Sequence, residues 1–134
     1  KILELGTANG YSGIILGSEG AELTTIELNS EIAEEAKTNF KEYKIKAKVI
    51  IGDAVEEIKN LNENFDLIFI DFAKRKYIEV LEIAIGLLNK KGVIVADNIT
   101  MEGCQDFKKA VINHHKLKTE IINIKDGLSY SLLQ

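Results

Sequence analysis

The chain opens with a short apolar stretch that runs directly into a glycine-rich turn, and this feature restricts the fold more than any other. Residues 1–5 suit a buried β-strand, and Gly6 and Gly10 bracket the turn that follows. A strand, a turn that needs glycine and a following helix can hold a nucleotide-like cofactor on backbone N–H groups. We therefore expect an α/β protein with a ligand site at the end of its first strand.

Apolar runs alternate with segments of helical period along most of the chain, which is typical of βαβ units around a parallel sheet. Polar capping residues at 29–31 predict the start of one helix, and apolar spacing from Tyr77 to Leu88 predicts another that stops at Gly92. The expected strands are residues 1–5, 23–28, 48–51, 66–70 and 93–96.

The alternation of apolar runs and helical segments changes in the last third of the chain. A helix is expected over residues 105–113, followed by strand-like runs at 117–124 and 128–133. Asp126-Gly127 between these runs predicts a β-hairpin with a two-residue turn, which would add one antiparallel strand to an otherwise parallel sheet. The prediction is a single doubly wound, Rossmann-like α/β domain over residues 1–134 with a seven-stranded sheet.

Composition supports one soluble globular domain, because 134 residues with 46% hydrophobic and 28% charged side chains can bury a sizeable core. Cys104 is the only cysteine, so no disulfide within the chain is possible and a reducing, cytoplasmic setting is expected. The apolar runs are too short to cross a bilayer, and no leader precedes the first strand, so we expect no membrane insertion. Because the chain begins on Lys within a strand, we expect it to be a fragment that lacks an N-terminal segment.

The net charge of −4 argues against a protein that binds nucleic acid over its whole surface. Lysines nevertheless gather in two clusters. Such clusters more often form solvated surface than a binding face, although a local basic face stays open as an alternative. The clusters are Lys41, Lys44, Lys46 and Lys48, and Lys108, Lys109, Lys116 and Lys118.

An acidic residue ends the second expected strand, at the place where a carboxylate can accept both hydroxyls of a ribose. Glu27 lies about twenty residues beyond the first glycine of the turn. A dinucleotide fingerprint would place glycine at positions 8 and 11, but this chain has Ala8 and Tyr11. The turn therefore lacks the close approach that a pyrophosphate needs, which makes an NAD-dependent dehydrogenase a distant alternative. The expected cofactor has a ribose and no pyrophosphate.

Oxygen-bearing side chains follow the fourth and fifth expected strands. Asp71 comes after the fourth strand, and Asp97 and Asn98 end the fifth. In the strand order that doubly wound folds adopt, these two strands are neighbours, and neighbouring strands lie about 5 Å apart. The three side chains can therefore converge on one point at the carboxyl edge of the sheet. Hard oxygen ligands favour Mg²⁺, Ca²⁺ or Mn²⁺ over zinc. A lone Asp at a strand end is more often a helix cap, but the full set favours a metal site.

Two sets of residues carry a resemblance to a known family. The motif Glu4-x-Gly6-x-x-x-Gly10-Tyr11-Ser12, with Glu27, resembles the first two motifs of class I S-adenosylmethionine-dependent methyltransferases. The sets Phe69-Ile70-Asp71-x-x-Lys74-x-x-Tyr77 and Val95-Ala96-Asp97-Asn98 resemble the Mg²⁺-dependent O-methyltransferases. That group includes catechol and caffeoyl-CoA O-methyltransferases and bacterial relatives that act on transfer RNA. The resemblance extends from the first strand to the C-terminal hairpin.

The resemblance implies S-adenosylmethionine as cofactor and a divalent cation, Mg²⁺ or else Mn²⁺ or Ca²⁺, held by Asp71, Asp97 and Asn98. The Ser12 hydroxyl would hold the methionine part of the cofactor, and Asp53 would reach the adenine edge. The residues expected to bind the cofactor are Glu4, Gly6, Thr7, Gly10, Tyr11, Ser12, Glu27, Leu28, Asp53, Ala54 and Asp71.

The expected chemistry is transfer of a methyl group to a metal-bound hydroxyl whose pKa the cation lowers. Lys74, three residues beyond Asp71, would accept the hydroxyl proton. Lys74, Arg75 and Lys76 form a short basic run that a solvated surface would also explain. The spacing of Lys74 from Asp71 is the reason to prefer catalysis.

The acceptor expected from the resemblance is a small phenolic or catechol-like molecule. The alternatives are a hydroxylated wobble uridine of transfer RNA and a non-catalytic cofactor-binding module. Many bacterial members have Asp-Ala-Asp-Lys where this chain has residues 71–74, so a second carboxylate is missing at Ala73, but other members also lack it and metal binding is still expected. Catechol-type enzymes have a glutamate where Ser129 stands, which makes a simple catechol less suitable. The family's N-terminal helices, which contribute to the pocket and often to a dimer, are absent from this chain. The resemblance leaves a homodimer open as a partner state.

Three aromatic or titratable features are expected to be structural. Tyr77 should pack on its helix, and Tyr11 should lie in the core or under the cofactor. The adjacent His114 and His115 follow a helix and cannot both face one site, so we assign them no chemistry.

Overall fold

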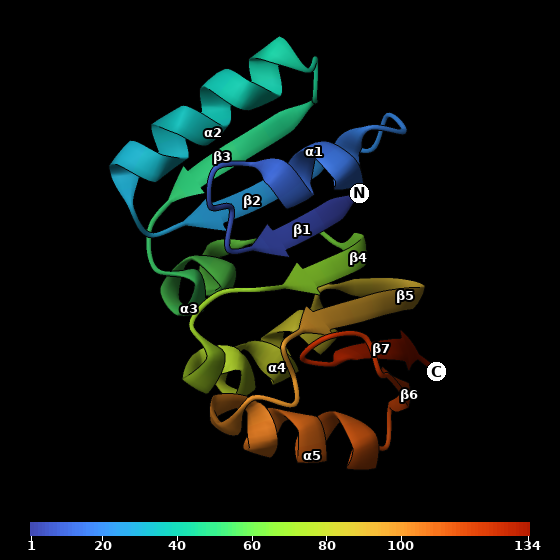
Figure 1. The fold of residues 1–134 in the computed structure, drawn as a ribbon. Helices are drawn as coiled ribbons and strands as arrows, with labels where there is room; N and C mark the ends of the chain where they lie inside the picture. Colours follow the sequence, from blue (N-terminus) through green and yellow to red (C-terminus); the bar gives the residue numbers. More distant parts are fainter.

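Seven β-strands form one sheet in the computed structural model, which describes residues 1–134 (Figure 1). The strands are β1 (Ile2–Leu5), β2 (Leu23–Glu27), β3 (Ala47–Ile51), β4 (Phe65–Ile70), β5 (Leu88–Asp97), β6 (Leu117–Ile122) and β7 (Leu128–Leu133). The α-helices are α1 (Tyr11–Gly17), α2 (Ser30–Glu42), α3 (Ala54–Glu57), α4 (Tyr77–Gly86) and α5 (Gln105–Asn113). Short 3₁₀ turns, η1 to η3, lie at Ile58–Asn60, Lys74–Lys76 and Glu102–Cys104.

The strand order is β3-β2-β1-β4-β5-β7-β6, and the first five strands in this order pair in parallel. β7 is antiparallel to both of its neighbours. This confirms the predicted doubly wound sheet with one antiparallel strand. The order also makes β4 and β5 neighbours, with Ile70 paired to Ala96, so the ends of these strands meet at one edge.

The boundary between α4 and β5 differs from the prediction. The helix ends at Gly86, where the Leu87 N–H bonds back to the carbonyls of Ile83 and Ala84. Leu88 already pairs with Phe65 of β4, so Gly92 lies inside a strand and does not stop a helix. The pairing register between β4 and β5 is irregular just before Val93. β5 therefore starts at Leu88, five residues before the apolar run at 93–96 that predicted it.

The connection between β6 and β7 is also longer than predicted. β6 ends at Ile122 and β7 begins at Leu128, so residues 123–127 form the loop and the two-residue turn is wrong. Lys125 and Gly127 both have positive φ, and the Gly127 N–H bonds to the carbonyl of Ile124. A wider loop is needed because Ile99 and Thr100 donate hydrogen bonds into it, which ties it to the end of β5.

Helices cover both faces of the sheet, but unequally. Asn29 caps α2 as predicted, since its side chain accepts a bond from the Ile32 N–H. Ala36 and Phe40 of α2 form a small core with Leu23. On the other face, α3 to α5 cover a much larger core built on residues such as Ile68. None of the helices combines the length and the apolarity that crossing a membrane requires.

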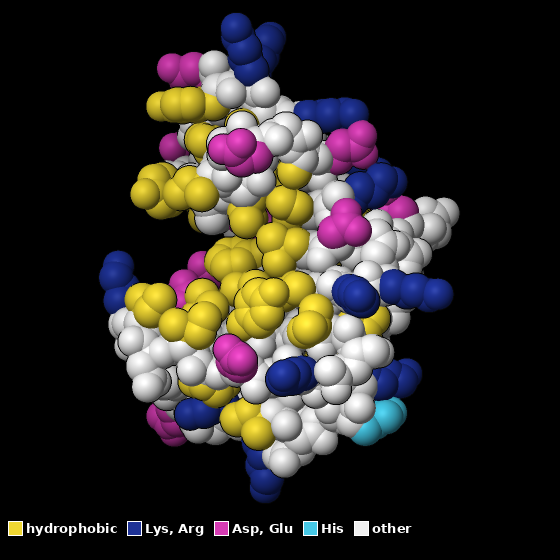
Figure 2. Space-filling model, turned by 90° about the vertical axis from the view of Figure 1, so that its right-hand side faces the viewer, with side chains coloured by type: hydrophobic (Ala, Val, Ile, Leu, Met, Phe, Trp, Pro, Cys, Tyr) yellow, Lys and Arg dark blue, Asp and Glu magenta, His cyan; other side chains and the backbone are white.

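Part of the face that carries α1 and α2 has no helix over it. Figure 1 shows β4, β5 and β7 unobstructed below α1. Figure 2, which views the molecule from the right-hand side of Figure 1, shows hydrophobic side chains gathered in a band across the middle of that side. Phe69 of β4, Val95 of β5 and Tyr130 of β7 are paired in register, so they share a face, and none of them is fully buried. We call these three residues the open sheet face.

Candidate functional site

The turn after β1 is held in a conformation that glycine alone tolerates at its first position. Gly6 has φ of 103°, and a Cβ added there would lie 1.9 Å from the backbone oxygen of Asp71. Ala8 and Gly10 also have positive φ. The ends of β1 and β4 therefore touch backbone to backbone, which places Asp71 beside the glycine turn.

A buried polar network lies beneath this turn. Glu4 has no exposed surface, and its two carboxylate oxygens accept bonds from Ser12 Oγ at 2.5 Å and Thr25 Oγ1 at 2.7 Å. Thr7 Oγ1 lies 2.6 Å from Thr25 Oγ1 and donates to it, because the Thr25 proton is committed to Glu4. Burial raises the pKa of Glu4, and the two hydroxyl donors offset part of that rise. Glu4, Thr7 and Ser12 thus brace the turn from below.

Glu27 fastens the turn to β2. Its two carboxylate oxygens accept the Ala8 N–H at 2.8 Å and the Asn29 N–H at 2.9 Å. Each oxygen keeps a further lone pair, so the carboxylate can still accept hydroxyl groups from a ligand. The neighbouring Leu28 is 69% exposed and presents an apolar side chain to the same space.

A cleft of about 230 Å³ opens at the carboxyl edge of the sheet, where β1, β2 and β4 end. It is lined by eleven residues: Gly6, Ala8, Ile26, Glu27, Leu28, Asp53, Ala54, Asp71, Phe72, Ala73 and Lys76. Six of the predicted cofactor residues line this cleft: Gly6, Glu27, Leu28, Asp53, Ala54 and Asp71. The structure therefore brings together residues from four separate loops at the edge where open α/β sheets bind ligands.

Five predicted cofactor residues do not line the cleft. Glu4, Thr7 and Ser12 lie beneath the turn, and Gly10 packs against the ring of Phe40. Tyr11 is 74% exposed and borders a different hollow beside α2, so the expectation that it lies in the core is wrong. It begins α1, and the left-handed Gly10 before it turns its side chain outward into solvent.

Sequence reasoning missed one charged wall of the cleft. Lys76 Nζ lies 3.1 Å from Asp53 Oδ2, which bridges the loop after β4 to the start of α3. This contact, together with the bond from the Val55 N–H, holds the pKa of Asp53 below its usual value. No local signal joins the two residues, because they are 23 positions apart in the chain. The apolar lining residues Ile26, Phe72 and Ala73 were missed as well.

The predicted base lies next to Asp71. Lys74 Nζ is 2.6 Å from Asp71 Oδ1 and 3.1 Å from the Tyr77 hydroxyl oxygen. Tyr77 is fully buried as predicted, and it also donates to the backbone oxygen of Asp97 at 3.0 Å. One short chain of polar contacts therefore joins the end of β4 to the end of β5.

Asp97 and Asn98 lie at the end of β5, as the sequence predicts. Asp97 Oδ1 accepts the Asn98 N–H at 2.8 Å, and Asn98 has φ of 61°, a conformation that Asn adopts more readily than most residues. The structure contains no group of three or more His, Cys, Asp or Glu side chains placed to hold a metal. The donor set near the β4 and β5 ends is two carboxylates and one amide, Asp71, Asp97 and Asn98.

Other groups singled out by the sequence have structural partners. His114 Nε2 lies 2.9 Å from Glu82 Oε1, its Nδ1 accepts the Lys116 N–H, and its ring stacks on that of His115. Cys104 is buried and its Sγ contacts the Lys74 carbonyl at 3.6 Å. These contacts stabilise the fold around α4 and α5.

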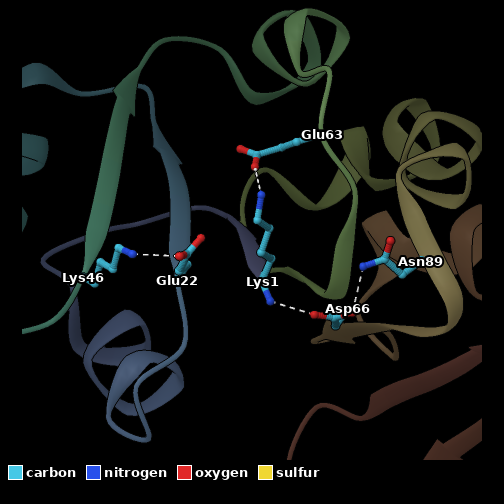
Figure 3. Close-up of polar contacts among 6 residues, drawn as sticks. All are labelled: Lys1, Glu22, Lys46, Glu63, Asp66 and Asn89. Carbon is cyan, nitrogen blue, oxygen red and sulfur yellow. Dashed lines mark hydrogen bonds and ion pairs between the residues drawn. The ribbon is translucent and has the colours of Figure 1, made fainter.

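A second hollow, of about 280 Å³, lies at the opposite edge of the sheet, where β2 and β4 begin. Four of its five charged side chains form ion pairs: Lys46 with Glu22 at 2.7 Å and Lys1 with Glu63 at 2.8 Å (Figure 3). Because only the Lys48 ammonium is left without an ion pair, this hollow lacks the several convergent unpaired groups of a reactive site.

Comparison with known proteins gives the family of the chain. Residues 1–132 match the family model described as O-methyltransferase. The chain belongs to the O-methyltransferase family. The cleft at the carboxyl edge is therefore the candidate site of an O-methyltransferase domain.

In relatives within the family, about a third of the aligned residues are identical to those of this chain. It is 32% identical to catechol O-methyltransferase B of Danio rerio over 98% of the chain and 57% of that protein. It is 35% identical to catechol O-methyltransferase of Niastella koreensis over 77% of the chain and 51% of that protein. The chain thus spans about half the length of these relatives.

The fold is shared with solved O-methyltransferases. An O-methyltransferase from Bacillus cereus, solved in complex with SAH, superimposes with a TM-score of 0.91 at 25% identity. That match covers 99% of this chain and 73% of the other.

Proposed function

We propose that the protein is an S-adenosylmethionine-dependent O-methyltransferase that transfers a methyl group to a hydroxyl of a small acceptor, with the aid of a divalent cation. The observation that carries this proposal is the contact between Lys74 Nζ and Asp71 Oδ1, made where Asp71 lines the cleft. A potential base therefore adjoins the cofactor cleft. The catechol O-methyltransferase relatives and the neighbour solved with SAH support the same conclusion.

The cleft suits a nucleoside with an attached charged chain. Glu27 would accept the ribose hydroxyls, and Leu28 would contact the adenine ring through its exposed apolar side chain. Asp53 would accept a hydrogen bond from the exocyclic amine, and Asp71 would face the charged methionine part. When bound, S-adenosylmethionine supplies an electrophilic methyl group on a sulfonium.

The donor set at the ends of β4 and β5 suits a hard divalent cation. Carboxylate oxygens of Asp71 and Asp97 and the amide oxygen of Asn98 are ligands that Mg²⁺ prefers, with water completing its shell. The side-chain amide of Asn98 has no partner within the protein, so its oxygen is free to coordinate. A cation bound there would lower the pKa of an acceptor hydroxyl.

Lys74 is the residue proposed to take the hydroxyl proton. Its side chain is 25% exposed, so it reaches solvent and a bound acceptor while two neighbours restrict it. Lys74 accepts a proton only as the neutral amine, so proton loss from its ammonium must precede each turnover. The contact with Asp71 would hold the amine beside the place where the acceptor hydroxyl binds.

The acceptor is proposed to be a small phenol-like molecule. Ser129 occupies the position of the glutamate that catechol-type enzymes place after Asp-Gly-Leu, and it is fully buried. A second phenolic hydroxyl therefore has no carboxylate partner at this position, which favours acceptors with a single reactive hydroxyl. The two alternatives that the experiment must distinguish from this proposal are a transfer RNA acceptor and a role in cofactor binding without catalysis.

The test is methyl transfer from labelled S-adenosylmethionine by the complete protein, with Mg²⁺ or with EDTA, to a panel of phenols and to undermodified transfer RNA. We expect label in the phenols only when metal is present. Label in RNA would mean that the acceptor is transfer RNA and not a phenol. In that case RNA binding should depend steeply on salt, and the dependence should weaken when Lys108 and Lys116 are neutralised. Cofactor binding without transfer to any acceptor would instead favour the non-catalytic module.

Two variants locate the site within that assay. Asp97→Ala should abolish turnover while SAH affinity measured by calorimetry changes little, because Asp97 does not line the cofactor cleft. Lys46→Met, which breaks an ion pair at the opposite edge of the sheet, should leave both quantities unchanged. Full metal-dependent turnover by Asp97→Ala would exclude Asp97 from the site.

A further inference from the structure

Tyr77 is a buried polar group that the proposed chemistry has not yet used. It is the first residue of α4, its side chain has no exposed surface, and its hydroxyl oxygen contacts two groups on different loops. The hydroxyl donates to the backbone oxygen of Asp97 at 3.0 Å. A phenol has one proton, so the second contact, with Lys74 Nζ at 3.1 Å, is one in which the phenol accepts.

Aromatic packing fixes the ring that carries this hydroxyl. The Tyr77 ring stacks on Phe72 with centroids 5.5 Å apart, and Phe107 meets its edge at 5.4 Å. Phe72 itself lines the cofactor cleft. Burial raises the pKa of Tyr77, which keeps the hydroxyl protonated and able to donate to Asp97. The oxygen is therefore a fixed acceptor in a rigid wall.

Lys74 needs such a fixed partner. Its side chain has four rotatable bonds, and Asp71 is its only other partner, at 2.6 Å. Asp71 is also proposed to contact the cofactor and the cation, so its hold on the amine is shared with other ligands. Tyr77 lines no part of the cleft, so a bound cofactor does not compete for its contact with the amine.

We propose that Tyr77 is a positioning residue whose hydroxyl holds the Lys74 amine at a set distance from the end of β5, where the acceptor hydroxyl is presented. This inference rests on the proposed methyltransferase function. A tyrosine that served only through the packing of its ring would be replaceable by phenylalanine, since the ring packing uses no hydroxyl. The positioning role requires the oxygen itself.

The test compares Tyr77→Phe with Tyr43→Phe, which removes a hydroxyl from a tyrosine that is 61% exposed at the end of α2. We expect Tyr77→Phe to lower kcat by about tenfold to a hundredfold, the cost of a small misplacement of a reacting group. The KM for cofactor and the affinity for SAH should not change. Tyr43→Phe should match the wild type in all three quantities. An unchanged kcat in Tyr77→Phe would overturn the proposal.

A second readout does not depend on catalysis. Acetic anhydride acylates accessible amines, and peptide mass spectrometry gives the rate at each lysine, with Lys37 as internal reference. Loss of one of the two partners should make Lys74 react several times faster in Tyr77→Phe than in the wild type, and Tyr43→Phe should show no change. Equal rates at Lys74 would overturn the proposal even if kcat fell.

The two readouts separate failure of this inference from failure of the proposed function. If the wild type transfers no methyl group but Lys74 reacts faster in Tyr77→Phe, the contact between Tyr77 and Lys74 is supported and the methyltransferase proposal is wrong. If the wild type is active and neither readout responds, only the role of Tyr77 falls. Should Tyr77→Phe unfold, 3-fluorotyrosine at position 77 keeps the packing and weakens the acceptor, and the labelling rate decides.

Discussion

At the scale of single residues, Gly6 makes the most demanding contact of the site. Its positive φ and the Asp71 carbonyl both exclude a side chain, whereas Gly20 has positive φ of 86° and open space where a Cβ would lie. Gly20→Ala should therefore cost only the backbone strain, about 1–2 kcal/mol. Gly6→Ala should cost about 1–3 kcal/mol more, from overpacking, and should abolish SAH binding. Urea unfolding and calorimetry would measure both.

Equal losses of stability in the two variants would mean that the close approach of Gly6 to Asp71 is relieved by a small backbone shift. Retained SAH affinity in Gly6→Ala would show that the turn does not form the cofactor cleft.

Two buried serines on β7 provide a second test at this scale. Ser129 and Ser131 have no exposed surface, but only Ser131 has a partner. Its hydroxyl donates to Thr119 Oγ1 at 2.9 Å, because the Thr119 proton is committed to the carbonyl oxygen of Val111 at 2.7 Å. Ser129→Ala removes an unpaired buried hydroxyl and should stabilise the chain by up to about 1 kcal/mol. Ser131→Ala removes the hydrogen bond between Ser131 and Thr119 and should destabilise the chain by about 1 kcal/mol. Thermal unfolding would give the two signs, and destabilisation by Ser129→Ala would reveal an unseen partner of its hydroxyl.

At the scale of elements, the ion pair between Lys76 and Asp53 joins η2 to the start of α3. Lys76 lowers the pKa of Asp53 below its ordinary value of 3.8. The stability that the ion pair contributes is therefore present in full above pH 3.8 and is lost as the pH falls through the lowered pKa. Asp53→Asn keeps the helix cap but loses the pair. It should be less stable than the wild type by on the order of 0.5 kcal/mol at neutral pH, and the difference should vanish in strong acid.

The matched control is Glu22→Gln, which breaks the exposed pair with Lys46 at the other edge of the sheet (Figure 3). The difference in stability between this variant and the wild type should also vanish in strong acid, because Lys46 lowers the pKa of Glu22 in the wild type. Only Asp53→Asn should weaken SAH binding. Equal SAH affinity in the two variants would exclude the Asp53 pair from the cofactor cleft.

At the scale of the whole molecule, the two faces of the sheet differ in how much they bury. Ile68 and Phe69 are neighbours on β4 that point to opposite faces, Ile68 into the large core and Phe69 onto the open sheet face. In the 134-residue chain, Ile68→Ala should cost about 2–5 kcal/mol. Phe69→Ala should cost less than about 2 kcal/mol, since part of its area already contacts water. A larger loss at Phe69 in chemical unfolding would mean that this face is covered in solution.

Local patterns in the sequence were sufficient to predict the order of the strands along the chain and the positions of Gly6, Glu27, Asp71 and Asp97 at strand ends. These predictions succeed because a period of two or 3.6 residues and a glycine turn are properties of neighbouring residues. The early start of β5 escaped prediction because the pairing of Leu88 with Phe65 is a contact between distant segments.

The sequence alone thus determined the fold class, the edge of the sheet that carries the site and most of the residues gathered there. Only the tertiary structure decided that Glu4 lies beneath the turn, that Tyr11 faces solvent and that Tyr77 joins Lys74 to the end of β5. The physical reason is that burial and hydrogen-bond partners depend on how separate βα units pack, and no local pattern records which side chains meet across that packing.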